Sequence, residues 1–277
     1  MSSLACRAVP AYNTAMPHTQ RRLLAWVERE VLRCRPFALR HFRSSSLRVE
    51  RKADRSPVTA ADRAIETRLR QALARGCPSE PVLGEEFGRS GRAGSTYWTV
   101  DPIDGTRAFS RGLPSWGVMV GRVERGVPVL AVCDFPAIGV TIGVAPGVAA
   151  YERVGTSVRR LPRARAGTAL REAVLFHGGM RWFAKTRHAA GFARLCRAVY
   201  LERAYGDCYG YLWALRGCAD AVLDYGVSLW DMAPFAAFAR ATGRVLVNFR
   251  GEPSFTGPDA IFAAPALARQ IIRKLHG

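Results

Sequence analysis

Apolar residues recur at helical spacing near the start of the chain, at Leu23, Leu24, Val27, Val31 and Leu32. This spacing predicts a long helix over Gln20–Phe42 that Pro36 kinks or ends. A loop at Ser44–Pro57 follows. Thr59 and Asp62 then stand at the spacing of a capping box and predict the start of a second helix. The apolar stripe of that helix is Ile65, Leu69 and Leu73.

From Val82 onward, short apolar runs between glycines and prolines replace the helical pattern and predict a meandering sheet. Its strands are expected at Tyr97–Val100, Trp116–Val123, Val129–Phe135 and Ile138–Val144. Later helices are expected at Ala189–Ala198, Tyr209–Cys218, Asp231–Ala241 and Leu267–Leu275. Later strands are expected at Ala221–Asp224, Leu246–Asn248 and Ala260–Ala263. Helices and strands alternate without a strict β-α-β rhythm, which favours a layered α/β or α+β sandwich.

The composition permits a packed core, since 49% of the 277 residues are apolar. The net charge of +19 raises nucleic acid as a partner. However, 38 of the 41 basic residues are arginines, although a phosphate-binding surface has no reason to exclude lysine. The basic residues are also scattered along the chain rather than grouped. We therefore expect no nucleic-acid partner and keep a nucleic-acid-binding protein as an alternative.

The seven cysteines include no Cys-x-x-Cys pair, which argues against a disulfide framework and a structural zinc. A reducing compartment fits best. The first 17 residues lack the apolar segment of a signal peptide. The longest apolar stretch, Val127–Ala150, contains Asp134 and three prolines and is typical of strands joined by turns. We therefore expect a cytoplasmic protein without a membrane partner.

Carboxylates carry the chemistry that this sequence suggests. Glu85, Glu86, Asp101, Asp104 and Asp231 each stand at the end of an apolar segment. Carboxylates held close together repel one another unless a cation neutralises them, and such sites suit hard cations such as magnesium. The alternative is a capped turn with surface acids. The chain has no P-loop, no G-x-G-x-x-G and no G-x-S-x-G motif, and its five histidines show no ligand spacing.

The turn after Asp101 is suited to binding an anion. Pro102 stiffens this turn, and Gly105 lets the backbone approach a ligand closely. If a helix begins here, Gly105 and Thr106 present free N–H groups to an anion.

Together these motifs resemble the inositol monophosphatase superfamily of magnesium-dependent phosphatases, from about residue 20 to the end of the chain. They occur in the order Lys52, Pro57-Val58-Thr59-Ala60-Ala61-Asp62, Gly84-Glu85-Glu86, Asp101-Pro102-Ile103-Asp104-Gly105-Thr106 and Trp230-Asp231. The resemblance implies a layered αβαβα sandwich of the inositol monophosphatase/fructose-1,6-bisphosphatase type. Residues 1–17 would form an irregular extension. Residues 18–277 would form one phosphatase domain, with a metal-site lobe at about 18–165 and a substrate-side lobe at about 166–277.

The resemblance also implies roles for individual residues. Glu85, Asp101 and the Ile103 carbonyl would hold one magnesium ion, and Asp101, Asp104 and Asp231 a second. A third, weaker ion would lie near Glu85 and Glu86. The N–H groups of Gly105 and Thr106 would bind the phosphate. Thr106, hydrogen-bonded to Asp62, would activate the attacking water with Glu85 close by, as in two-metal catalysis. A homodimer is expected.

Substrate choice depends on Gly206-Asp207-Cys208-Tyr209-Gly210-Tyr211. Gly-Asp followed by aromatic residues resembles the histidinol-phosphatase branch, as do Arg107 and Arg111–Trp116. Asp207 would pair with the ammonium or imidazole group of L-histidinol phosphate; alternatively, Asp207 only caps the following helix. Asp224 stands where inositol-specific relatives contact substrate hydroxyls. Inositol 1-phosphate or another small phosphate ester is the alternative substrate, and a degenerate interaction protein is the alternative outside enzymes.

Overall fold

The computed structural model describes residues 17–44, 47–51 and 57–277. Its first two helices are α1 (Pro17–His41) and α2 (Ala60–Gly76), which pack against each other. α2 begins at the predicted capping box, in which the Thr59 side chain accepts a backbone N–H and the Asp62 carboxylate accepts the Thr59 N–H. α1 does not end at Pro36. It runs on to His41 because Cys34 and Ala38, on either side of the proline, are buried in the same apolar cluster.

An eight-stranded sheet has the strand order β10-β9-β8-β7-β6-β5-β3-β4. From β5 to β10, consecutive strands pair antiparallel, which confirms the predicted meander, whereas β3 pairs parallel with β5. Its strands are β3 (Val82–Gly84), β4 (Gly88–Arg89), β5 (Thr96–Asp104), β6 (Gly117–Glu124), β7 (Val127–Phe135), β8 (Val140–Ala145), β9 (Val148–Val154) and β10 (Ser157–Arg160).

A five-stranded sheet has the order β12-β11-β13-β15-β14. β11 pairs parallel with both β12 and β13, and β15 pairs antiparallel with β13 and β14. Its strands are β11 (Val174–His177), β12 (Leu201–Arg203), β13 (Ala221–Tyr225), β14 (Val245–Val247) and β15 (Asp259–Ala263). The other helices are α3 (Thr106–Ser110), α4 (Met180–Ala184), α5 (Ala189–Ala198), α6 (Asp207–Leu215), α7 (Leu229–Thr242) and α8 (Pro265–His276). Two short 3₁₀ turns span Pro136–Ile138 and Leu170–Glu172.

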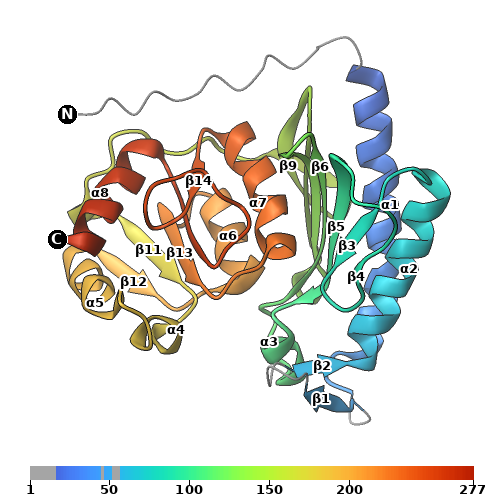
Figure 1. Cartoon of the computed structure of the whole chain (residues 1–277), viewed down its shortest axis with the longest axis horizontal. Coiled ribbons are helices and arrows are strands. Elements are labelled where there is room, and N and C mark those ends of the chain that lie inside the picture. The colour runs from blue at the N-terminus through green and yellow to red at the C-terminus, as the bar shows by residue number, and fades with distance from the viewer. Residues whose placement is uncertain (1–16, 45–46, 52–56) are drawn as a thin grey trace.

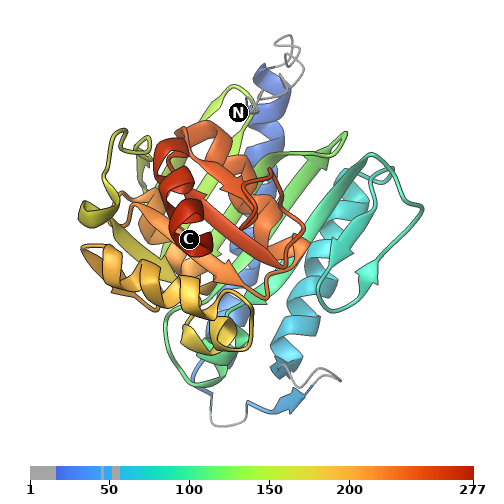
Figure 2. The same cartoon turned by 60° about the vertical axis from the view of Figure 1, so that its left-hand side comes forward.

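The helices and sheets form five layers. Figure 1 shows α1 and α2 on the outer face of the larger sheet and α6 and α7 between the two sheets, and Figure 2 brings α5 and α8 to the front of the smaller sheet. Side chains alternate between the two faces of each strand, so each face of the larger sheet packs against a different pair of helices. Leu130 and Val132 of β7 face the α1 and α2 side, whereas Ala131 and Cys133 face the α6 and α7 side. A third apolar cluster joins the smaller sheet to α5 and α8. The predicted αβαβα sandwich is confirmed.

Some expectations about secondary structure were wrong. The segment 44–57, predicted as a loop, contains β1 (Val49–Arg51), which pairs antiparallel with β2 (Pro57–Thr59). β9, β10, β11, β12 and α4 were not predicted, and all of them except β9 are only three to five residues long. The predicted extension lies almost wholly outside the described residues, and the division into two lobes stays a prediction. Among the described helices, none has the length and apolarity needed to cross a bilayer.

Candidate active site

Three aspartates from distant parts of the sequence meet between the two sheets. The carboxylate oxygens of Asp101, Asp104 and Asp231 lie within 4.8 Å of one another. Asp101 and Asp104 end β5, and Asp231 lies in the first turn of α7. Asp101 is 1% exposed, and the other two are half-buried. The structure therefore brings together three of the predicted metal ligands.

A β-bulge explains how Asp101 and Asp104 reach the same site. Three residues apart on a regular strand, their side chains would point to opposite faces of the sheet. The register with β6 shifts between them, since Asp101 pairs with Met119 and Asp104 with Gly117. The extra residue on β5 turns the strand locally, as bulges do, and brings both carboxylates into one cluster.

Backbone N–H groups orient all three carboxylates. Asp101 Oδ1 accepts the Ile103 N–H at 3.1 Å, and Asp104 Oδ2 accepts the Cys208 N–H at the start of α6. Asp231 Oδ2 accepts the Ser228 N–H at 2.7 Å as part of the capping box of α7. These hydrogen bonds restrict the rotation of the three side chains and leave each carboxylate with a second oxygen for a ligand.

The charges of the cluster oppose one another. Burial raises the pKa values of Asp101 and Asp104 well above the ordinary range, and Glu85 adds to the shift of Asp101. Burial also raises the pKa of Asp231 to about 7. A divalent cation would neutralise carboxylates that are buried together in this way. The donors are all hard oxygen atoms, so the chemistry of the site fits magnesium.

The loop that carries Glu85 is held by residues that the sequence analysis missed. Glu66 of α2 is fully buried, and its carboxylate accepts the N–H groups of Glu86 at 2.7 Å and Phe87 at 3.2 Å. Arg70, one turn later, donates to the same carboxylate at 2.7 Å. The available signal was a Glu and an Arg four residues apart beside the apolar stripe of α2. Glu85 itself lies near enough to raise the pKa values of Asp101 and Asp231.

Asp62 and Thr106 lie side by side. The Thr106 hydroxyl is 3.4 Å from Asp62 Oδ1 and 3.0 Å from the Ile103 carbonyl oxygen, so its proton has two acceptors. Asp62 is fully buried, and its other oxygen accepts the Thr59 N–H and hydroxyl at 2.8 and 2.6 Å. Burial raises the pKa of Asp62 to about 6. A carboxyl group with this pKa can both hold and release a proton near neutral pH.

The predicted phosphate-binding turn has the expected backbone. α3 begins at Thr106, directly after Gly105. Gly105 has a φ of 85°, and a Cβ there would lie 2.7 Å from the Ser115 carbonyl oxygen, so only glycine fits. Lys52, the first residue of the motif series, lies outside the described residues.

The two predicted substrate-binding aspartates lie near the cluster. Asp207 is the exposed first residue of α6 and adds to the raised pKa values of Asp104 and Asp224. The N-cap of α6 is Gly206, with no side-chain capping bond, so the capping alternative for Asp207 gains no support. Asp224 is 3% exposed at the end of β13, and burial raises its pKa well above the ordinary range. Its Oδ2 has no hydrogen-bond partner among the described residues.

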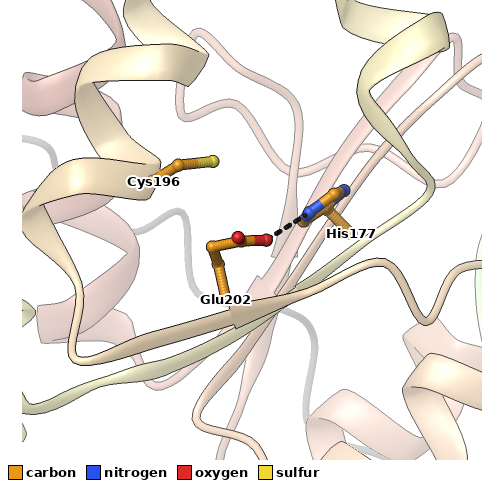
Figure 3. A group of neighbouring side chains, drawn as sticks. All are labelled: His177, Cys196 and Glu202. Atoms are coloured by element: carbon orange, nitrogen blue, oxygen red, sulfur yellow. Dashed lines mark hydrogen bonds and ion pairs between the residues drawn. The ribbon is translucent and has the colours of Figure 1, made fainter.

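A second group of potential metal ligands is His177, Cys196 and Glu202, whose donor atoms also lie within 4.8 Å of one another (Figure 3). His177 Nδ1 accepts the Gly179 N–H at 3.0 Å, which leaves the ring proton on Nε2, 3.0 Å from Glu202 Oε2. Burial raises the pKa of the Cys196 thiol to about 11. These hydrogen bonds connect Glu202 through the His177 ring to the Gly179 backbone, so we interpret this group as a support for the turn at Gly179.

Comparisons with known proteins give the family and the fold that this chain is similar to. The model of the inositol monophosphatase family matches residues 24–277. The histidinol-phosphatase of Mycobacterium tuberculosis is 34% identical over 236 residues, which cover 85% of this chain and 90% of that protein. The inositol-1-monophosphatase of Mycobacterium bovis is 28% identical and covers 79% of this chain and 78% of its own. The structure of a Thermotoga maritima IMPase aligns with a TM-score of 0.79 at 22% identity, over 92% of this chain and 96% of that one.

Proposed function

The chain belongs to the inositol monophosphatase family and is a phosphoric monoester hydrolase, and we propose that its substrate is L-histidinol phosphate. The observation that carries this proposal is Asp207, an exposed carboxylate beside the three-aspartate cluster, with the buried Asp224 near it. A cationic alcohol gains a charge-assisted hydrogen bond from Asp207, whereas a neutral polyol gains less. The 34% identity to a histidinol-phosphatase supports the same substrate.

We propose that two magnesium ions bind here, one held by Glu85, Asp101 and the Ile103 carbonyl and the other by Asp101, Asp104 and Asp231. The convergence of the three aspartates supports this assignment. A third, weaker ion would lie near Glu85 and Glu86. Bound magnesium supplies positive charge that neutralises the carboxylates and polarises the phosphate ester.

The residues of the chain supply orientation and proton transfer. The N–H groups of Gly105 and Thr106 bind phosphate oxygens. The Thr106 hydroxyl accepts a proton from the attacking water and passes its own proton to Asp62 Oδ1, 3.4 Å away. Asp62 can accept this proton because its pKa of about 6 leaves it mostly ionised at pH 7. Glu85 lies close to the same water in this arrangement.

A phosphate-release assay across four substrates tests the substrate assignment. The panel contains L-histidinol phosphate, inositol 1-phosphate, fructose 1,6-bisphosphate and 3′-phosphoadenosine 5′-phosphate. We expect the highest kcat/KM for histidinol phosphate. A higher kcat/KM for inositol 1-phosphate would refute the assignment and favour the alternative, for which the 28% identity to an inositol-1-monophosphatase is the support.

We also propose that the protein works in the cytoplasm as a homodimer. The six described cysteines are free, which suits a reducing compartment. Size-exclusion chromatography with light scattering measures the oligomeric state, and a monomer at micromolar concentration would contradict the proposed dimer.

A further inference from the structure

Trp182 lies beside the proposed substrate site without any assigned role. It is part of α4, which follows β11, and its side chain is 38% exposed. The guanidinium carbon of Arg107 lies 5.1 Å from the centre of its ring. Arg107 follows Thr106 on α3, and its charge opposes the upward pKa shift of Asp207. Arg107 therefore connects the indole ring to both the phosphate-binding turn and Asp207.

Glycines bring the backbone of two segments close to this ring, and a third segment packs against one of them. A Cβ at Gly226, after β13, would lie 3.5 Å from the indole, and one at Gly178, after β11, would lie 3.7 Å from it. β11 and β13 are parallel, so the ring covers the carboxyl ends of both strands. A Cβ at Gly178 would also overlap Asp224 Oδ1, and one at Gly206 would lie 2.5 Å from the Gly178 Cα atom. Trp182, Asp224 and the segment that carries Asp207 therefore surround one short stretch of backbone.

The chemistry of this group is selective. Carboxylates bind N–H groups of a cation, and an indole ring attracts cations and stacks on flat rings. A neutral polyol offers neither a charge nor a flat ring. A large aromatic side chain left 38% exposed beside two carboxylates is therefore suited to a ligand that is both flat and cationic.

We propose that Trp182 is a specificity-determining residue that packs against the imidazole end of the substrate alcohol while Asp207 pairs with its charge. This inference rests on the proposed function and names the side chain that recognises the part of the substrate away from the phosphate. The opposing interpretation is that Trp182 only braces α3 against α4 through Arg107.

The test compares Trp182→Leu and Trp182→Phe in the magnesium-loaded enzyme, with L-histidinol phosphate and inositol 1-phosphate as substrates. Loss of the ring should lower kcat/KM for histidinol phosphate by roughly 5- to 30-fold, mostly through KM, and Phe should restore most of it. Activity on inositol 1-phosphate should change less than about twofold, because the alcohol part of this substrate has neither a charge nor a flat ring for the indole and the metal ligands are untouched. Equal losses on both substrates would support the brace and overturn the proposal.

Inhibition by the alcohol product alone gives a second readout. L-Histidinol should inhibit Trp182→Leu more weakly than the wild type, whereas inorganic phosphate should inhibit both equally. Trp213→Leu is the matched control, since Trp213 also carries an arginine on its ring, Arg216 at 4.5 Å. The ratio of the activities on the two substrates should be the same for Trp213→Leu as for the wild type. If Trp213→Leu lost as much activity on histidinol phosphate as Trp182→Leu, the proposal would be overturned. A wild type without preference for histidinol phosphate refutes the proposed function, whereas a preference that survives Trp182→Leu refutes only this inference.

Discussion

Replacing Asp231 with asparagine should stabilise the metal-free protein and abolish the activity of the magnesium-loaded enzyme. Burial raises the pKa of Asp231 from 3.8 to about 7, so its ionised form disfavours folding at neutral pH. The shift of about 3 units corresponds to at most about 4 kcal/mol at 1.36 kcal/mol per unit. Asp101 and Glu85 share the electrostatic repulsion with Asp231, so the full penalty does not belong to Asp231 alone. We therefore expect Asp231→Asn to raise the free energy of unfolding by about 2–4 kcal/mol. Asparagine keeps an acceptor for the Ser228 N–H, so the helix cap survives.

The pH dependence of this gain follows from the direction of the shift. The pKa is higher in the folded state than in the unfolded state, so the bound proton stabilises the fold. That contribution is complete below about pH 4 and is lost as the pH rises to about 7. The free energy of unfolding of Asp231→Asn should therefore exceed that of the wild type most at pH 8. The difference should be less than half as large at pH 5 and close to zero below pH 4.

Urea denaturation in the presence of a chelator measures this difference at pH 5 and pH 8. Asp220→Asn is the matched control, because Asp220 is also half-buried and accepts a backbone N–H, from Val174 at 2.9 Å, outside the cluster. That control should show no gain at pH 8. A metal-free Asp231→Asn that is less stable than the wild type at pH 8, or a gain that does not depend on pH, would refute the electrostatic reasoning.

Three further predictions concern activity. Thr106→Ala should lower kcat far more than it raises KM, because proton transfer acts in the transition state; a change confined to KM would contradict this. Asp62→Asn should resemble it, and the double variant should be little worse than either single one, whereas additive losses in kcat would show that the two residues act independently. Glu66→Gln should weaken magnesium activation by roughly 10- to 100-fold by loosening the loop that carries Glu85, and an unchanged activation constant would show that this loop needs no such support.

The sequence contained enough to predict the layers and to bring the aspartates together. Apolar runs in the middle of the chain predicted the meander. The resemblance to the inositol monophosphatase superfamily implied that Asp231, 127 residues beyond Asp104, lies near it. The roles of these residues in catalysis stay predictions. What the motifs could not supply is the bulge that turns Asp101 and Asp104 to one side, because it depends on the register with β6.

Other features were hidden because tertiary contacts decide them. Pro36 reads as a helix end by local rules, yet packing against the larger sheet holds α1 together on both sides of it. Glu66 reads as a surface acid, but the N–H groups of a distant loop satisfy its carboxylate in the core. Trp182 reads as one aromatic among many, and only the fold places it beside Arg107.

We propose that carboxylate-bound magnesium enables this chain to hydrolyse L-histidinol phosphate. The most direct test measures phosphate release from L-histidinol phosphate by chelator-treated wild-type protein as magnesium is added back, beside Asp101→Asn under the same conditions. We expect no activity in the chelator, full recovery with magnesium, and a loss of roughly 10³-fold or more in the variant. Full wild-type activity in the chelator, or an Asp101→Asn variant as active as the wild type, would refute this proposal.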